Sequence, residues 1–258
     1  MITAGIDCGA KNTKTVVMRD GLIIGLGVVL TGFDQSVAVR QSLEMALLNA
    51  GVSRKHLSCI AGTGSGAKAV SEADVMVNEI KAMAEAGNYF FPSGRTIADL
   101  GAEEARTARI GEKVTIVDFA INDKCAAGTG SFIEAMGRAL ETPLEKMGEL
   151  ALLSDNSIPM NAQCTIFAES EVVGLIHAKT PREDISKAIH DSLASRIASM
   201  IRRVGMHPDM VMMGGVAYNR GLVSAVQREL GIETVLIPEK PEYGAATGAA
   251  VVAANKGQ

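Results

Sequence analysis

The sequence predicts an α/β protein of two similar domains around a cleft, because one order of elements occurs twice along the 258 residues. In each half, a first predicted strand ends in Asp-x-Gly, as in Asp7-Cys8-Gly9 and Asp99-Leu100-Gly101. In each half, a glycine turn follows a later strand, as in Gly62-Thr63-Gly64 and Gly214-Gly215-Val216. Paired signatures in the same order favour an internal repeat. We therefore assign residues 1–95 to an N-terminal domain and residues 96–258 to a C-terminal domain.

The first half begins with three predicted strands, which end at residue 7 and then cover 13–18 and 22–30. Asp20-Gly21 between the last two strands is a β-hairpin signal. A helical pattern follows at 35–50, then a strand at 57–61 and a helix at 71–85. The predicted order is therefore β-β-β-α-β-α.

The second half repeats this order with extra helices inserted. Predicted strands cover 96–99, 105–110 and 114–119. Predicted helices cover 129–140, 164–178 and 182–204. The chain then continues through a strand at 210–213, a helix at 219–230, a strand at 233–237 and a helix at 244–254.

Composition favours a globular protein with small-molecule or protein partners. Hydrophobic residues make up 47% of the chain, which is enough for a large core. A formal net charge of -4 without a Lys/Arg cluster argues against nucleic-acid binding. No window approaches the ~18 apolar residues of a membrane helix, and the N-terminus does not read as a secretion signal. We expect a cytoplasmic protein, and its four cysteines fit a reducing compartment.

The turn after the first strand has the composition of a phosphate-binding loop. Small residues let backbone N–H groups approach a phosphate, and a lysine supplies positive charge, as in Gly9-Ala10-Lys11-Asn12-Thr13-Lys14. Asp7 and Asp99 at the two strand ends suit a hydrated Mg²⁺. Each feature alone is also typical of an ordinary turn or a solvated lysine. Their symmetric order is what favours a nucleotide site.

Two cysteines, Cys125 and Cys164, each stand at the start of a predicted helix without a nearby second thiol. A four-thiolate iron–sulfur site is completed most simply by a second copy of the chain, with one cluster on a two-fold axis. Two other interpretations stay open. The cysteines are buried small hydrophobes, or Cys8 and Cys59 join them in a single-chain site, although both of those look like core residues.

Five motifs, spread over nearly the whole chain, carry a resemblance to a known family. They are Gly5-Ile6-Asp7-x-Gly9, Asn122-Asp123-Lys124-Cys125-Ala126-Ala127-Gly128-Thr129-Gly130, Cys164-Thr165-Ile166-Phe167-Ala168-Glu169-Ser170-Glu171, Gly214-Gly215-Val216-Ala217-Tyr218-Asn219 and Gly244-Ala245-Ala246-Thr247-Gly248-Ala249-Ala250. With them the chain resembles the ATPase activators of 2-hydroxyacyl-CoA dehydratases and the ATPase subunits of benzoyl-CoA reductases. The cysteine motifs are specific to that group, whereas the glycine motifs are shared with the acetate and sugar kinase/Hsp70/actin superfamily.

The resemblance implies two ribonuclease-H-like (actin-like ATPase) domains around a nucleotide cleft. It implies a homodimer, or a dimer with a homologous subunit, in which Cys125 and Cys164 of both chains hold one [4Fe-4S] cluster. Each chain would bind one ATP with Mg²⁺. ATP binding and hydrolysis would drive one electron from ferredoxin or flavodoxin to a CoA-ester dehydratase or reductase.

Two segments depart from the pattern of this family. The usual Gly-Ser-Thr after the first aspartate is Gly9-Ala10-Lys11, which lacks two hydroxyl groups. The usual Asp-Ile-Gly-Gly-Gln-Asp is Asp99-Leu100-Gly101-Ala102-Glu103-Glu104, so Glu103 replaces an amide that orients the attacking water. Glu103 acts either as a general base or as a charge that repels the γ-phosphate. These departures resemble the benzoyl-CoA reductase branch more than the dehydratase activators.

The candidate site residues form three groups. Candidates for catalysis are Asp7, Asp99 and Glu103. Candidates for nucleotide binding are Gly9, Lys11, Asn12, Thr13, Lys14, Gly101, Ala102, Gly214, Gly215, Asn219 and Glu242. Candidates for metal ligands are Cys125 and Cys164.

Two other functions stay open on the same scaffold. A small-molecule kinase would phosphorylate acetate or a sugar, bind no iron and tolerate loss of the cysteines. A non-catalytic ATP-binding regulatory module would bind nucleotide tightly without turnover, which the altered Ala102-Glu103 segment permits.

Overall fold

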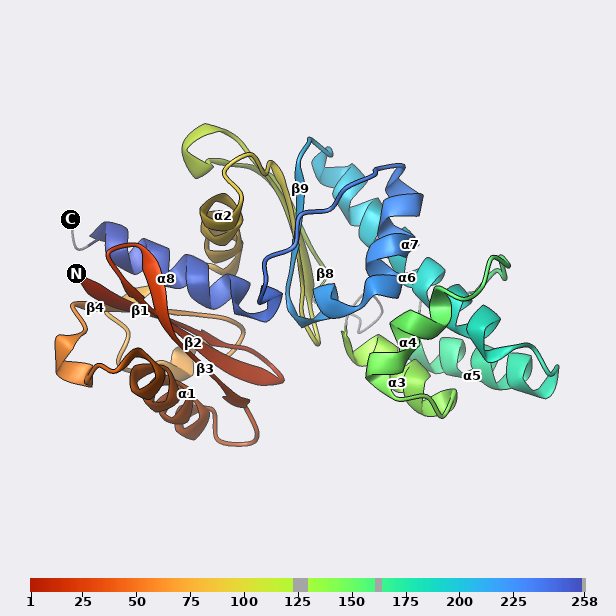
Figure 1. Cartoon of the computed structure of the whole chain (residues 1–258), viewed down its shortest axis with the longest axis horizontal. Helices are drawn as coiled ribbons and strands as arrows, with labels where there is room; N and C mark the ends of the chain where they lie inside the picture. Colours follow the sequence, from red (N-terminus) through yellow and green to blue (C-terminus); the bar gives the residue numbers. More distant parts are fainter. Residues whose placement is uncertain (123–129, 161–163, 257–258) are drawn as a thin grey trace.

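The computed structural model describes residues 1–122, 130–160 and 164–256. Two β-sheets lie side by side with helices between and around them, which confirms the predicted α/β class (Figure 1). The strands are β1 Ile2–Cys8, β2 Asn12–Arg19, β3 Leu22–Leu30, β4 Cys59–Thr63, β5 Val75–Met76, β6 Thr96–Leu100, β7 Ala105–Ile110, β8 Ile116–Asn122 and β9 Met210–Met213. The α-helices are α1 Gln35–Ala50, α2 Glu79–Phe90, α3 Gly130–Ala139, α4 Leu144–Ala151, α5 Thr165–His177, α6 Arg182–Val204, α7 Arg220–Leu230 and α8 Gly244–Lys256.

The two sheets repeat one topology, with strand orders β3-β2-β1-β4-β5 and β8-β7-β6-β9. An antiparallel meander opens each sheet, and a later strand lies parallel to its first strand, β4 to β1 and β9 to β6. Asp7 pairs with Lys14 across the first hairpin, and Asp99 pairs with Arg106 across the second. Equivalent residues therefore meet at the same edge of the two sheets.

Helix α1 forms where the sequence predicted it because both of its ends are capped. The Asp34 carboxylate accepts hydrogen bonds from the backbone of Ser36 and Val37, and Gly51 ends the helix at φ 64°. The helix packs closely on β3, where a Cβ at Gly27 would lie 2.0 Å from the Ser42 carbonyl oxygen. The close approach of helix and strand requires glycine at that position.

Helix α8 returns from the second sheet to the first (Figure 1). It packs on β1, β4 and α2, and a Cβ at Gly5 would lie 2.1 Å from the Ala246 carbonyl oxygen. The last helix of the chain, which its sequence position assigns to the C-terminal domain, thus covers the sheet of the N-terminal one. The C-terminal segment ties the two halves together.

Helices α3, α4 and α5 are inserted between β8 and α6 and lie together at one end of the molecule (Figure 1). Phe132 and Met136 of α3 share one core cluster with Ala168 and Val172 of α5. No helix in the described ranges is long and apolar enough to cross a membrane.

Four elements differ from the sequence prediction, and one of them is β5, which lies in the segment predicted as a helix at 71–85. The helix predicted at 71–85 begins only at Glu79, because the Asn78 side chain caps it by accepting from the Ile80 N–H at 2.8 Å. Helix α4 was not predicted, since its eight residues are too few for a clear period. The strand predicted at 233–237 is reduced to a bridge between Val211 and Leu236.

Candidate functional site

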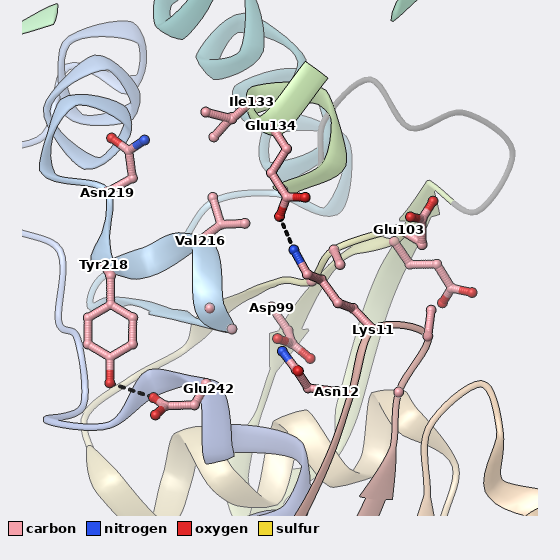
Figure 2. Close-up of a pocket in the computed structure, with 18 of the residues that line it drawn as sticks. Lys11, Asn12, Asp99, Glu103, Ile133, Glu134, Val216, Tyr218, Asn219 and Glu242 are labelled. Atoms are coloured by element: carbon pink, nitrogen blue, oxygen red, sulfur yellow. Dashed lines mark hydrogen bonds and ion pairs between the residues drawn. The ribbon is translucent and has the colours of Figure 1, made fainter. Parts of the chain in front are cut away.

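A cleft of about 730 Å³ lies between the two sheets, and both hairpin turns line it (Figure 2). The structure brings most of the sequence-predicted nucleotide-site residues to it. These are Asp7, Gly9, Lys11, Asn12, Lys14, Asp99, Gly101, Ala102, Glu103, Gly214, Gly215, Asn219 and Glu242. They come from both halves of the chain, as a site between two repeated domains requires.

The hairpin turns are built alike. The Gly9 N–H donates to the Asn12 carbonyl at 3.2 Å, and the Gly101 N–H donates to the Glu104 carbonyl at 2.9 Å. The glycine after each parallel strand is also equivalent, since Gly64 has φ 96° and Gly214 has φ 86°. Such values of φ favour glycine, and both residues bring backbone close to an aspartate.

The two aspartates at the strand ends are largely buried, and each faces a cation. Lys14 Nζ lies 2.9 Å from Asp7 Oδ2, and Arg106 Nη1 lies 3.9 Å from Asp99 Oδ2. Burial raises the pKa of Asp99, the Arg106 guanidinium opposes this, and the Asp7 charge adds to it. Burial alone would lower the pKa of Lys14, but Asp7, Asp99 and Glu242 outweigh that effect and raise it.

The donor set suits Mg²⁺ bound together with phosphates. Mg²⁺ typically takes one or two carboxylates and completes its shell with water and phosphate oxygens. Asp7 and Asp99 are close enough for the charge of one to raise the pKa of the other. Among the described residues, no group of three or more His, Cys, Asp or Glu is arranged to hold a metal by itself. The two aspartates therefore fit a metal whose remaining ligands come with the substrate.

Arg106 was not identified from the sequence, although it takes the place of Lys14 in the second hairpin. It is 8% exposed, donates to Glu79 Oε1 at 2.5 Å and also bonds Glu104. Its Nε is buried without a hydrogen-bond partner. The sequence repeat could have identified Arg106, because an alignment of the two Asp-x-Gly hairpins places a basic residue opposite each aspartate.

Thr13 is the one predicted nucleotide-binding residue that does not line the cleft. Its side chain is fully buried, and its hydroxyl lies 3.0 Å from the Thr31 hydroxyl. Thr31 in turn donates to the Gly9 carbonyl oxygen at 2.7 Å. Thr13 therefore supports the turn that begins at Gly9 through Thr31.

Asn219 lines the cleft, but its side chain is already engaged. Its Oδ1 accepts from the Leu222 N–H at 3.0 Å and caps α7, while its Nδ2 lies 3.0 Å from His190 Nε2. His190, to which the sequence assigned no role, donates through Nδ1 to the Ser186 carbonyl oxygen at 2.7 Å. Burial lowers the pKa of His190, so the imidazole is neutral and accepts from Asn219.

Glu242 accepts a hydrogen bond from the Tyr218 hydroxyl at 2.6 Å, and both residues line the cleft (Figure 2).

Part of the cleft wall is apolar, which the sequence did not indicate. Leu144 at the start of α4 and Leu152 just after its end line the cleft together with Val216. These side chains suit a flat heterocyclic base.

Glu103 is tied to the start of α3. Its carboxylate accepts from the Ser131 hydroxyl at 2.6 Å. The Gly130 and Ser131 N–H groups donate to the carbonyls of Gly101 and Ala102, each at 2.9 Å. The second hairpin therefore holds the N-terminus of α3 by both backbone and side chain.

The cysteines separate into two kinds. Cys8 and Cys59 are buried, and burial raises the pKa of both thiols. Cys164 is partly exposed and occupies the N-cap of α5 in an extended conformation. Cys125 lies outside the described residues, so its position relative to Cys164 stays a prediction.

The comparisons with known proteins agree with the resemblance. The chain is 38% identical to the activator of lactoyl-CoA dehydratase of Anaerotignum propionicum over 259 residues, covering 100% of this chain and 99% of the relative. A subunit of the benzoyl-CoA reductase of Thauera aromatica is 27% identical over 97% of this chain and 92% of its own length. The identities therefore do not favour the benzoyl-CoA reductase branch.

Two solved structures superpose over the whole chain at 33% identity. Component A of the Acidaminococcus fermentans (R)-2-hydroxyglutaryl-CoA dehydratase has a TM-score of 0.95 and is covered to 99%. The activator of the 2-hydroxyisocaproyl-CoA dehydratase from Clostridium difficile, with bound ADPNP, has a TM-score of 0.93 and is covered to 96%. With a sugar kinase of the ROK family at a TM-score of 0.62 and 14% identity, the likeness shows the fold alone. The predicted actin-like ATPase fold is confirmed.

A model described as the BadF/BadG/BcrA/BcrD ATPase family matches residues 4–253, which is nearly the whole chain. With the repeated hairpins, the cleft and the full-length similarities, this match leads to one conclusion. The chain belongs to the BadF/BadG/BcrA/BcrD ATPase family.

Proposed function

We propose that this protein uses ATP to pass one electron to a CoA-ester enzyme, either a 2-hydroxyacyl-CoA dehydratase or a benzoyl-CoA reductase. The names of its full-length relatives support this class of partner. The higher identity to the activators favours the dehydratase. Ferredoxin or flavodoxin is the expected electron donor.

In this proposal, ATP occupies the cleft between the two hairpins. Asp7 and Asp99 hold Mg²⁺, while Lys14 and the Gly9 turn contact the phosphates. The ADPNP bound to a relative of the same fold supports a nucleotide as the ligand. Ser131 holds Glu103 through one carboxylate oxygen, and the other oxygen is the one that accepts the proton of the attacking water in this proposal.

The observation that carries the redox part is the environment of Cys164. It is partly exposed at the start of α5, where N–H groups and the helix dipole favour a negatively charged centre. Cys164 and Cys125 of two chains complete a four-thiolate set for a [4Fe-4S] cluster. Such a cluster supplies a one-electron carrier of low potential. A thiolate site requires a reducing compartment, and the cytoplasm expected from the sequence is one.

The surface around Cys164 supports a dimer. Ile166 and Phe167 lie in the first turn of α5, just after Cys164 and Thr165. Ile166 is 72% exposed and Phe167 is 66% exposed. Adjacent apolar side chains of this size are typical of a surface that another protein covers. A second copy of α5 placed there across a two-fold axis would bury them and bring the two Cys164 residues together.

Iron content after oxygen-free purification tests the proposal. We expect about two irons per chain, because one four-iron cluster is shared by two copies. Cys125→Ser and Cys164→Ser should abolish iron binding. Cys59→Ala is the matched control, since Cys59 is buried in the first domain and should leave the iron content unchanged.

Three outcomes would contradict the proposal. About four irons per chain would indicate a single-chain cluster. A colourless monomer that hydrolyses ATP would exclude the shared cluster. Phosphorylation of added acetate or glucose by an iron-free preparation would favour the kinase alternative.

A further inference from the structure

We propose that Glu134 is a positioning residue for Lys11. It holds the lysine in the nucleotide-free protein and releases it to the phosphates when ATP binds. The inference rests on the proposed function, because it takes ATP as the ligand of the cleft.

The contact joins the two sides of the cleft. Lys11 lies in the turn of the β1–β2 hairpin, and its Nζ forms an ion pair with the Glu134 carboxylate on α3 (Figure 2). Both side chains line the cleft. The Lys11 side chain is 43% exposed and that of Glu134 is 25% exposed, so neither is locked by packing. A pair of this kind contributes little stability and exchanges readily.

The rest of the α3 N-terminus is held differently. Backbone bonds of 2.9 Å join Gly130 to Gly101 and Ser131 to Ala102, all on the side of the second sheet. The first hairpin reaches α3 through Lys11. Helix α3 is therefore anchored to one half of the molecule and held to the other by an exchangeable charge.

A triphosphate competes for that charge. It carries more negative charge than one carboxylate, and the small Gly9-Ala10 turn leaves it room beside Lys11. The ammonium group of lysine is a point charge with three donors, so it can change partner without matching a fixed geometry. Once Lys11 turns to the phosphates, Glu134 is left without its cation and is repelled by them.

The consequence reaches the cysteine-bearing region. Helix α3 follows the segment that contains Cys125 and packs against α5, which begins after Cys164. Loss of the Lys11–Glu134 pair frees α3 from the first hairpin while it stays bonded to the second.

Glu134→Gln tests the exchange without changing the size of the side chain. We expect it to tighten the binding of ADPNP about two- to five-fold, because the nucleotide no longer has to break an ion pair. In a Lys11→Gln background the same change should give a clearly smaller gain, because only the repulsion between Glu134 and the phosphates is then removed. The control is Glu149→Gln, which removes another carboxylate from the same cleft wall. Titration calorimetry at low salt measures all four variants.

A charge-reversed pair separates exchange from simple support. Lys11→Glu with Glu134→Lys should restore the nucleotide-free contact, but bind ADPNP more weakly than the unaltered protein. If the pair were only structural, the reversal would restore nucleotide affinity as well.

The exchange is overturned if Glu134→Gln leaves ADPNP affinity unchanged or lowers it, or if the affinity gain is as large in the Lys11→Gln background as in the unaltered protein. An unaltered protein that binds no ADPNP would overturn both this inference and the proposed function. An iron-free protein with the expected affinities would contradict the proposed electron transfer and support the exchange.

Discussion

The two hairpins at the cleft share a backbone plan but hold their aspartates differently. Asp7 faces Lys14 at 2.9 Å, whereas Arg106 lies 3.9 Å from Asp99 and is shared with Glu79 and Glu104. The arginine is committed to a network that connects β6, β7 and α2. The lysine has one close carboxylate and is left with donors for a ligand. A repeated fold has thus placed a lysine with one close carboxylate in one half and an arginine shared by three carboxylates in the other.

The largest effect should come from the aspartates that hold the same position in the two halves, Asp7 and Asp99. Asp7→Asn and Asp99→Asn should each lower Mg²⁺-dependent ATPase activity by about 10³-fold, because each removes a carboxylate that we propose as a ligand of Mg²⁺. Asp155→Asn, at an exposed site, is the control. Full activity of either variant would show that the aspartate it replaces is not needed to bind the metal.

The glycines after β4 and β9 test the backbone equivalence. A Cβ at Gly64 would lie 2.4 Å from Asp7 Oδ1, and at Gly214 it would lie 2.2 Å from the Leu100 carbonyl oxygen. Gly64→Ala and Gly214→Ala should each lower the free energy of unfolding by about 3 kcal/mol, measured with urea. Gly231→Ala, with φ 67° but open space, should cost about 1 kcal/mol. A large difference between Gly64 and Gly214 would break the equivalence.

Substitution of the two cations should affect different properties, the stability of the fold for Arg106 and the binding of ATP for Lys14. Arg106→Gln should destabilise the fold by about 2 kcal/mol, because Asp99 then stays buried beside two other acidic groups. Lys14→Gln should cost less stability and weaken ATP binding more. Urea unfolding and nucleotide titration of both variants measure the contrast. The opposite ranking would mean that Arg106 is the main phosphate ligand.

The smallest effect should come from His190, which contacts Asn219 at the cleft. The pKa of His190 is lowered by burial below its ordinary 6.5, so the unfolded chain takes up this proton before the folded chain does. The contribution of His190 is therefore full above pH 6.5 and is lost as the pH falls toward its folded value. His190→Gln should flatten the pH dependence of urea unfolding in that window. An unchanged profile would show that Asn219 is positioned without the neutral imidazole.

Much of the fold could be predicted because its signals are local. Helix α1 begins and ends where Asp34 and Gly51 cap it, and the Asp20-Gly21 turn sets the register of β2 and β3. The helix before the second half was misplaced, because its true start depends on the Asn78 cap and not on hydrophobic period. The prediction of a strand at 233–237 was wrong, since the segment forms only one bridge to β9, between Leu236 and Val211.

The candidate site was predictable to the extent that it repeats. The matched Asp-x-Gly turns led to Asp7, Asp99 and the glycines around them. Arg106 was missed because the sequence shows its charge but not its burial. Side-chain contacts could not be predicted either, since Thr13 points into the core and Asn219, which lines the cleft, also caps a helix.

By itself, the sequence determined the repeated α/β order, the two aspartates and the cysteine motifs, because these depend on residues that are neighbours in the chain. Tertiary structure alone decided how Arg106 is buried among carboxylates, how Glu103 is held and what Lys11 contacts. Lys11 and Glu134 are 123 positions apart, and only packing of the inserted helices beside the first hairpin brings them together. Contacts between distant residues depend on the whole fold, and no local pattern encodes them.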